Sequence, residues 1–150
     1  MFPHAHIEDF TVGDVFEYGA YAVTEAEILE FGRRFDPQSY HTDPEAAKTG
    51  PFNGLIASGL HTGSIFLRLL IDAFPNAVSL GSPGWDETRW TAPVRPGDVL
   101  SARSEVVEAR LSKTRPDRGL ISMQNVLSNQ DGEMVFRVLN YWFIGRRGEG

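Results

Sequence analysis

An acid and an imidazole stand close together in the segment Phe35-Asp-Pro-Gln-Ser-Tyr-His-Thr-Asp-Pro44. Asp36 and His41 lie on one short, proline-constrained stretch, so both side chains can reach the same water molecule. Further along comes Ile56-Ala-Ser-Gly-Leu-His-Thr-Gly-Ser64, in which small residues lead into a long apolar run. Exposed N–H groups at the start of a helix can hold a carbonyl oxygen. Together the two segments predict water chemistry beside a polarised carbonyl.

The residue types match the hydration of an alkene conjugated to a thioester. That reaction needs an oriented water, a group that takes its proton, a group that protonates the α-carbon, and donors for the enolate oxygen. Asp36 and His41 supply the acid and the base. The Gly59 amide is the candidate oxygen donor, because a residue without a side chain permits close approach and an amide at a helix start is not used within the helix. Ser64, one helical turn further on, can bond the Asp36 carboxylate or a substrate oxygen.

Ordinary structural roles compete with each of these assignments. An Asp before Pro is commonly a turn residue, a loop His is commonly solvated, and Ser64 can be small only to let a strand pack closely. His61 is expected to be packed or exposed rather than a ligand, and His4 and His6 are expected in a frayed terminus. No carboxylate stands at metal-site spacing from these histidines, so we expect neither a metal nor an organic cofactor.

Other aromatic and basic residues also have simpler explanations. The aromatic residues Trp85, Trp90, Trp142 and Phe143 are expected in the core or at an interface. The basic residues Arg89, Arg95, Lys113 and Arg115 can meet a phosphate of coenzyme A, although solvation at the surface is the simpler role.

Composition narrows the class of protein. The chain has 150 residues, is 41% hydrophobic and 23% charged, and shows no linker or repeat, which predicts a single domain over residues 1–150. A net charge of -6 argues against a nucleic-acid partner. Cysteine is absent, which excludes disulfides and thiolate chemistry. No segment approaches the ~18 apolar residues of a membrane span and the N-terminus lacks a basic leader, so we expect a cytoplasmic protein with no membrane partner.

Local signals indicate how the chemistry-bearing residues are positioned. Residues 15–23 are expected to form a strand, followed at Thr24 by a capping box and a short helix. Pro37 disfavours helical geometry at Asp36, so a loop is expected from there to Asn53-Gly54. The apolar spacing over Ile56–Phe74 predicts one long helix.

Everything after Pro75 is expected to be sheet. Turn signals separate runs at about residues 79–92, 99–110, 119–129 and 133–145. The last run is apolar on both alternating faces, which predicts a strand covered on both sides. The long helix can cover one side, and we expect a second subunit on the other.

These residues resemble the MaoC-like dehydratases, a family that includes the (R)-specific enoyl-CoA hydratases of the hotdog fold. The hydratase signature Asp-x-Asn-Pro-x-His is similar to Asp36-Pro-Gln-Ser-Tyr-His41, and an Ile-Ala-His-Gly-Met-like segment is similar to Ile56-Ala-Ser-Gly-Leu60. The later Trp90-Thr-Ala-Pro-Val-Arg-Pro-Gly-Asp98 is similar to the family's strand, turn and Pro-Gly-Asp step. The resemblance covers nearly the whole chain.

The resemblance implies an α+β hotdog fold, in which a curved antiparallel sheet of about five strands wraps a long helix. It further implies a homodimer, with higher oligomers open, and active sites near the subunit interface. By matching positions, Asp36 and His41 are the catalytic pair, the Gly59 amide is the oxyanion donor, and Ser64 is a supporting hydrogen-bonder. The implied chemistry is reversible syn addition of water to a trans-2-enoyl thioester, which gives the (R)-3-hydroxyacyl product. The implied substrate is a thioester of coenzyme A or acyl carrier protein.

Three residues depart from the signature, and these departures concern the substrate. Gln38 stands where the family has Asn, Ser39 where it has Pro, and Ser58 where it commonly has His. Gln38 therefore joins the expected substrate-binding residues, and a branched or dicarboxylic acyl group is as compatible as a straight chain. Two alternative functions remain open: a hotdog thioesterase, disfavoured because the helix carries no acid before Asp72, and a non-catalytic acyl-thioester binding subunit, disfavoured because Asp36 and His41 are both present.

Overall fold

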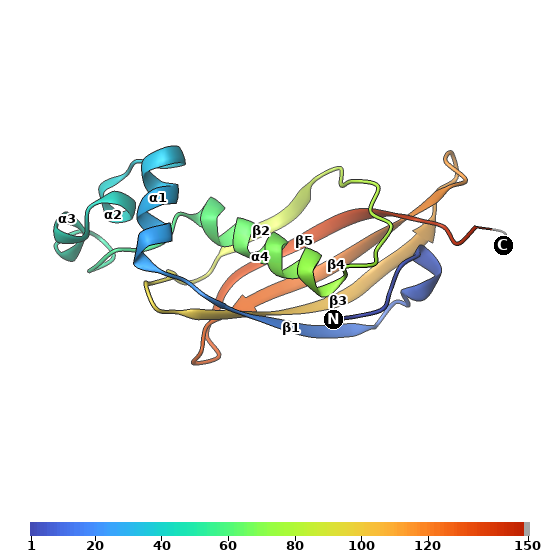
Figure 1. The fold of residues 1–150 in the computed structure, drawn as a ribbon, viewed down its shortest axis with the longest axis horizontal. Helices are drawn as coiled ribbons and strands as arrows, with labels where there is room; N and C mark the ends of the chain where they lie inside the picture. Colours follow the sequence, from blue (N-terminus) through green and yellow to red (C-terminus); the bar gives the residue numbers. More distant parts are fainter. Residues whose placement is uncertain (149–150) are drawn as a thin grey trace.

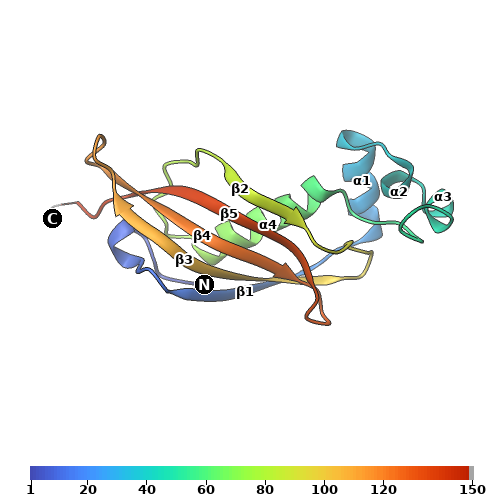
Figure 2. The ribbon, with the colours of Figure 1, turned by 180° about the vertical axis from the view of Figure 1, so that it is seen from behind.

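The structure, a computed structural model, describes residues 1–148. Within that range five strands form one antiparallel sheet in the order β1-β3-β4-β5-β2, and the long helix α4 lies across one face (Figure 1). The same view places the short helices α1, α2 and α3 together at one end of the sheet. Figure 2 shows the opposite face, where the strands are in front of α4. The elements are β1 (Val15–Ala22), α1 (Glu25–Phe35), α2 (Ser39–Thr42), α3 (Pro44–Lys48), α4 (Gly59–Ala73), β2 (Trp85–Trp90), β3 (Val99–Leu111), β4 (Arg118–Ser128) and β5 (Met134–Gly145). An α-helix on a curved antiparallel sheet is the α+β hotdog fold expected from the sequence.

The junction of β1 and α1 confirms the capping signal. Thr24 is the N-cap of α1, and its side-chain oxygen accepts a hydrogen bond from the amide of Glu27 at 3.2 Å. This bond satisfies one of the amides that a helix start leaves unpaired. Ile28 is fully buried, so α1 packs against the core by its apolar side. The helix has Asp36 as its C-cap, as Pro37 predicts.

The helix α4 is shorter at its N-terminal end than the expected Ile56–Phe74. Residues 56–58 are not helical, and the amides of Ile56 and Ala57 find partners outside the helix. The amide of Ile56 donates to the Tyr40 carbonyl and that of Ala57 to the Val94 carbonyl, both at 2.9 Å. The helix therefore begins at Gly59, with Ser58 as its N-cap. Its buried side packs on the core face of the sheet, against residues such as Met123 and Phe136.

The expected strand at residues 79–92 is broken in two. Its first part pairs with β5 only around Ser79, where an isolated bridge joins Ser79 to Ile144. Gly81 and Gly84 then adopt left-handed backbone angles on either side of Pro83, which cannot donate to a ladder. The regular strand β2 is therefore limited to Trp85–Trp90, at the edge of the sheet. The other three expected strands differ from β3, β4 and β5 by a residue at one or both ends.

The expected loop after Asp36 contains two short helices that sequence reasoning missed. The helix α2 spans Ser39–Thr42 and α3 spans Pro44–Lys48. Asp43 caps α3 by accepting from the amides of Glu45 and Ala46 at 3.1 Å, and Pro44 occupies the first turn. An Asp-Pro pair with this role is a recognised helix start, so the signal was present.

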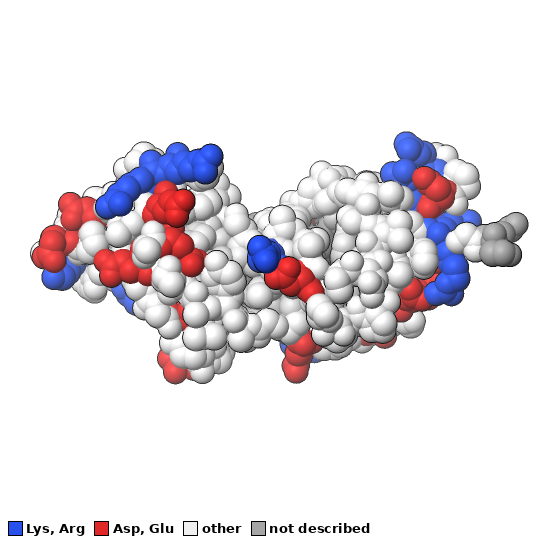
Figure 3. All heavy atoms as spheres, viewed as in Figure 1, with Lys and Arg blue, Asp and Glu red and all other residues white. Residues whose placement is uncertain are grey.

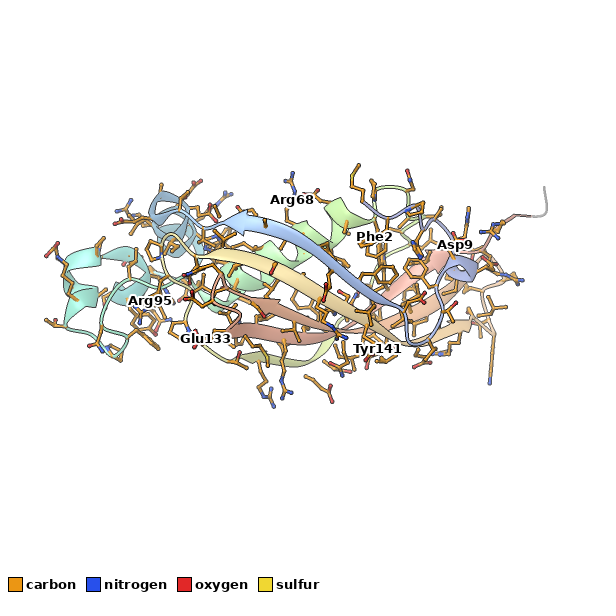
Figure 4. All side chains as sticks on the ribbon, turned by 90° about the horizontal axis from the view of Figure 1, so that it is seen from below. Phe2, Asp9, Arg68, Arg95, Glu133 and Tyr141 are labelled. Atoms are coloured by element: carbon orange, nitrogen blue, oxygen red, sulfur yellow. The ribbon has the colours of Figure 1, made fainter. Side chains whose placement is uncertain are left out.

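The N-terminus is ordered against the core, and the expectation of fraying was wrong. The amide of Phe2 donates to the Ala73 carbonyl at 2.8 Å, and the Phe2 ring stacks on Phe74 at 5.2 Å. A short 3₁₀ helix, Ile7–Asp9, follows, and Ile7 and Phe10 are buried. Figure 4 shows Phe2 at the end of the sheet opposite to Arg95, far from the short helices.

The two faces of the sheet differ. On β5, the core-facing Val138 and Trp142 are buried, whereas Leu139 and Tyr141 on the outer face are only partly buried and Arg137 is exposed. Within one chain, α4 covers one face of the sheet, and the outer face is not fully covered. On the face that carries α4, Figure 3 shows most charged side chains toward the two ends, and a largely uncharged surface between them apart from a few charged residues near the middle. In the range that the structure describes, no helix is long and apolar enough to span a bilayer.

Candidate active site

Asp36 is held by hydrogen bonds on both carboxylate oxygens. It is the C-cap of α1, where its amide donates to the Gly32 carbonyl. Oδ1 accepts from Gln38 Nε2 at 2.7 Å, and Oδ2 accepts from Ser58 Oγ at 2.7 Å. Oδ2 also lies 3.2 Å from His41 Nε2. One contact from a neighbouring residue, Gln38, and one from a residue distant in sequence, Ser58, therefore fix the orientation of the Asp36 carboxylate.

His41 is buried, and its orientation is set by a backbone carbonyl. Nδ1 lies 2.7 Å from the Ile56 oxygen. Because a carbonyl only accepts, Nδ1 carries the hydrogen, and in neutral imidazole Nε2 then presents a lone pair. That lone pair faces Asp36 Oδ2, another acceptor. The two atoms are complementary to a water molecule that donates to both, or to one shared proton.

Electrostatics favour the ionised form of Asp36. Partial burial raises the pKa of its carboxyl, but hydrogen bonds from Gln38 and Ser58 and the electrostatic effect of the neighbouring His41 outweigh this increase. The pKa of Asp36 is therefore below its ordinary value. Ser58 had no predicted role, yet it is 1% exposed and delivers the only hydroxyl hydrogen bond that Asp36 receives from the described residues.

Gln38 contacts Asp36 and Tyr40. Its amide nitrogen faces Asp36, and its amide oxygen accepts a hydrogen bond from the Tyr40 hydroxyl. The side chain of Gln38 is exposed, whereas Tyr40 is half-buried and lines the cavity beside His41. Gln38 is not among the residues that line this cavity, and its expected substrate-binding role stays a prediction.

Gly59 is placed as expected, at the first position of α4. Its amide precedes the helical hydrogen-bond ladder and is available to a ligand. Its carbonyl accepts a hydrogen bond from Trp90 Nε1 at 2.7 Å. A Cβ at this position would lie 2.5 Å from Trp90 Cε2, so only glycine fits under the indole.

These residues converge on an apolar cavity of about 530 Å³. Asp36, His41, Ser58 and Gly59 line one part of it, and the rest is uncharged. The remaining lining residues are Tyr40, Phe52, Ile56, Ala57, Leu60, Thr62, Trp90, Thr91, Ala92, Pro93 and Val94. A mostly apolar cavity with a few convergent polar groups is typical of a small-molecule site.

Ser64 is not brought to Asp36. Its hydroxyl donates to the Leu60 carbonyl at 2.8 Å, and the residue lies in a second, neighbouring groove with Phe35 and Leu67. The hydrogen bond to Asp36 that was expected from Ser64 comes from Ser58 instead, so that part of the prediction for Ser64 was wrong. Ser58 is separated from Asp36 by 22 residues, a distance at which no local pattern indicates contact.

His61 is packed, in keeping with its expected structural role. It is 6% exposed, and its ring stacks on Phe31 at 5.0 Å. Nε2 lies 3.1 Å from Glu27 Oε1, and Nδ1 is buried with no hydrogen-bond partner among the described residues. Burial lowers the pKa of His61, and this effect outweighs the opposing effect of Glu27. The lowered pKa favours a neutral ring.

Arg95 has a structural contact. Its guanidinium donates to the Phe52 carbonyl at 2.6 Å and so secures the loop that covers the cavity. Figure 4 shows Arg95 at the end of the sheet where the short helices lie. Of the aromatic residues noted in the sequence, Trp142 is buried, whereas Trp85 and Trp90 are partly exposed.

The chain has a hotdog fold in which an acid–imidazole pair lines the same cavity as the start of α4, and its family match and structural neighbours include dehydratases and hydratases. The sequence pattern of the MaoC like domain matches residues 9–123. The chain therefore belongs to the MaoC-like domain family, as the resemblance of its motifs indicated.

Comparison with known proteins agrees with this assignment. The uncharacterized protein YdeM of Bacillus subtilis (strain 168) is 32% identical over 131 residues, which cover 87% of this chain and 92% of YdeM. The crystal structure of a MaoC-like dehydratase from Rhodospirillum rubrum is 38% identical with a TM-score of 0.86, over 97% of this chain and 99% of the other. The R-hydratase PhaJ1 from Pseudomonas aeruginosa is 24% identical with a TM-score of 0.73, over 95% and 86%, and shares the fold.

Proposed function

We propose that the protein is an acyl dehydratase or enoyl-thioester hydratase, which adds water reversibly to a trans-2-enoyl thioester and gives the (R)-3-hydroxyacyl thioester. One observation carries the proposal: Asp36 Oδ2 and His41 Nε2 lie 3.2 Å apart at the cavity, with the first amide of α4 beside them. The pair suits a single water, and the amide suits a thioester oxygen.

The proposed reaction follows from which atoms can accept protons. Asp36 Oδ2 and His41 Nε2 hold the water, and one of them takes its proton as the water oxygen bonds to the β-carbon. The alkene electrons move toward the thioester carbonyl, whose oxygen the Gly59 amide stabilises as an enolate. The enolate then collapses, and the α-carbon receives the proton from the same pair. Because oxygen and hydrogen both arrive from one side of the substrate, the addition is syn.

Purified protein incubated with trans-2-enoyl-CoAs and saturated acyl-CoAs tests the proposal. Loss of the conjugated enoyl absorbance without release of free thiol is the expected result. Release of free thiol from the saturated and the unsaturated thioesters alike would instead identify a thioesterase. Binding of the thioesters without either change would identify a non-catalytic subunit. A parallel series on acyl carrier protein distinguishes the two carriers, and chain-length and branched series define the acyl group.

We also propose that a second copy of the chain covers the exposed side of α4. Leu67 and Ile71 on that side are 44% and 46% exposed, and Trp85 on the adjacent edge strand is 37% exposed. Within residues 1–148, β2 pairs with β5 alone, so its outer edge is available to a second sheet. A homodimer buries both the apolar side of α4 and this edge.

Light scattering coupled to gel filtration tests the dimer. The wild-type chain is expected at twice the mass of one chain or a multiple of that mass, and Leu67→Glu with Ile71→Glu is expected as a monomer. Val12→Glu is the matched control, because Val12 is an apolar residue that is 59% exposed and precedes β1, the strand at the sheet edge opposite to β2. A wild-type monomer at micromolar concentration would refute the assembly.

A further inference from the structure

The hydrogen bonds around Gln38 have one orientation that fits an ionised Asp36. A carboxylate only accepts, so the amide nitrogen of Gln38 must face Oδ1, from which it lies 2.7 Å. The amide oxygen then faces the Tyr40 hydroxyl, which must donate because an amide oxygen only accepts. The result is a directed chain from Tyr40 through Gln38 to Asp36.

Tyr40 is independently fixed, so it can serve as the anchor of this chain. Its ring stands edge-on to the His41 ring at 4.6 Å and to the Phe52 ring at 5.1 Å. Its carbonyl accepts from the Ile56 amide at 2.9 Å. The ring and backbone of Tyr40 are therefore held by contacts that do not involve Gln38.

We propose that Tyr40 is a positioning residue that acts through Gln38 to hold the Asp36 carboxylate with Oδ2 facing His41. Gln38 stands where the family signature has Asn and carries one more rotatable bond, so ordering it costs more side-chain entropy. The Tyr40 hydroxyl offsets that cost by fixing the amide. The consequence for catalysis rests on the proposed function, whereas the effect on Asp36 does not.

The other groups near Asp36 stay in place when Tyr40 is changed. His41 faces the carboxylate from α2, and Ser58 contributes a neutral hydroxyl. The last turn of α1 carries Arg33 and Arg34, and the Arg34 guanidinium lies over the Phe35 ring at 5.0 Å. Tyr40→Phe removes only the hydroxyl and keeps the ring contacts with His41 and Phe52.

Titration of Asp36 by carbon-detected NMR tests the chain without any substrate. In Gln38→Leu the pKa of Asp36 is expected to rise, because a hydrogen bond that favours the charged form is lost. Tyr40→Phe is expected to raise it by a smaller amount, and the double variant is expected to match Gln38→Leu. Shifts that add in the double variant, or an unchanged Asp36 in Tyr40→Phe, would overturn the proposal.

Matched controls are available elsewhere on the chain. The Tyr141 hydroxyl donates to Asp86 Oδ2 at 2.7 Å, and Gln124 Nε2 donates to Glu87 Oε2 at 3.0 Å. Tyr141→Phe and Gln124→Leu thus remove the same kinds of bond away from the cavity. Both are expected to leave the Asp36 titration unchanged, and an equal shift in either control would overturn the proposal.

Kinetics give the second readout. Tyr40→Phe is expected to lower kcat about 3- to 10-fold with KM little changed, since one neutral hydrogen bond is lost. The acidic limb of its pH–rate profile is expected to move to higher pH, because Asp36 must be ionised. Coupled NMR shifts in a protein that hydrates no enoyl thioester would refute the proposed function and support the positioning chain. The opposite outcome is also possible: the wild type hydrates the enoyl thioester, but Tyr40→Phe changes neither the kinetics nor the titration of Asp36. That result would refute the positioning chain and leave the proposed function intact.

Discussion

Ser58 Oγ donates a hydrogen bond to Asp36 Oδ2 at 2.7 Å and so joins the residue before α4 to the residue after α1. The neighbouring Gly59 offers its amide to the same cavity. The carboxylate of Asp36 and the proposed oxyanion donor, the Gly59 amide, are therefore positioned by two adjacent residues, Ser58 and Gly59.

Replacing Ser58 by Ala should weaken catalysis by removing this bond. A hydrogen bond to a charged group is lost, so kcat is expected to fall about 10-fold or more. The pKa of Asp36 is expected to rise, which moves the acidic limb of the pH–rate profile upward. Ser64→Ala is the matched control, because that hydroxyl bonds the Leu60 carbonyl in the neighbouring groove. A larger loss in Ser64→Ala than in Ser58→Ala would contradict this account.

A methyl group at Gly59 should disturb the start of α4. The Cβ of Gly59→Ala would lie 2.5 Å from Trp90 Cε2, and we expect a destabilisation of about 1–3 kcal/mol together with loss of activity. Chemical denaturation and the enoyl assay measure the two effects. Gly63→Ala on the same helix is the control, because its Cβ would meet its nearest neighbour, Trp85, at an ordinary 3.4 Å. Equal behaviour of the two variants would show that the indole does not constrain Gly59.

Asp36→Asn and His41→Ala should separate catalysis from folding. Each removes one of the two groups that hold the water, so kcat is expected to fall about 10²- to 10⁴-fold. Asp36 is partly exposed, and Asn preserves its shape, so the stability of that variant should change little. His41 is buried, and His41→Ala is expected to be less stable, which requires rates measured below its unfolding transition. Wild-type rates in either folded variant would remove that residue from the mechanism.

Asp9 should stabilise the N-terminal segment in a pH-dependent way. The amides of His6 and Ala5 donate to its carboxylate and lower its pKa from 3.8 to about 2. The folded-state pKa is depressed, so the stabilisation is complete above pH 3.8 and is lost as the pH falls toward 2. Asp9→Ala should remove this stabilisation at pH 7 and have little effect near pH 2. If denaturant titrations gave the same difference between wild type and variant from pH 7 to pH 2, the assignment would fail.

Local patterns predicted the elements but not all the contacts between them. Thr24 before an apolar helical repeat and Pro37 after it defined α1, because both act through the adjacent backbone. The start of α4 was misplaced because Ile56 and Ala57 satisfy their amides with carbonyls of Tyr40 and Val94. Such partners are distant in sequence, and helical periodicity does not reveal them.

The candidate site shows the same division. Asp36, His41 and Gly59 were recognisable from spacing and residue type, and the structure brings them to one cavity. Ser58 was passed over in favour of Ser64, although both lie near the helix start. Which of the two serines bonds Asp36 depends on which hydroxyl points toward the end of α1. The direction of each hydroxyl depends in turn on the residue at which α4 begins.

Hydration of a trans-2-enoyl-CoA in D₂O, followed by NMR of the product, tests the central claim most directly. The account predicts an (R)-3-hydroxyacyl thioester with a single deuterium on the α-carbon, on the same face as the new hydroxyl, and the reaction should be lost in Asp36→Asn. Release of free thiol in place of hydration, or deuterium on the opposite face, would contradict the account. So would an unchanged rate in Asp36→Asn.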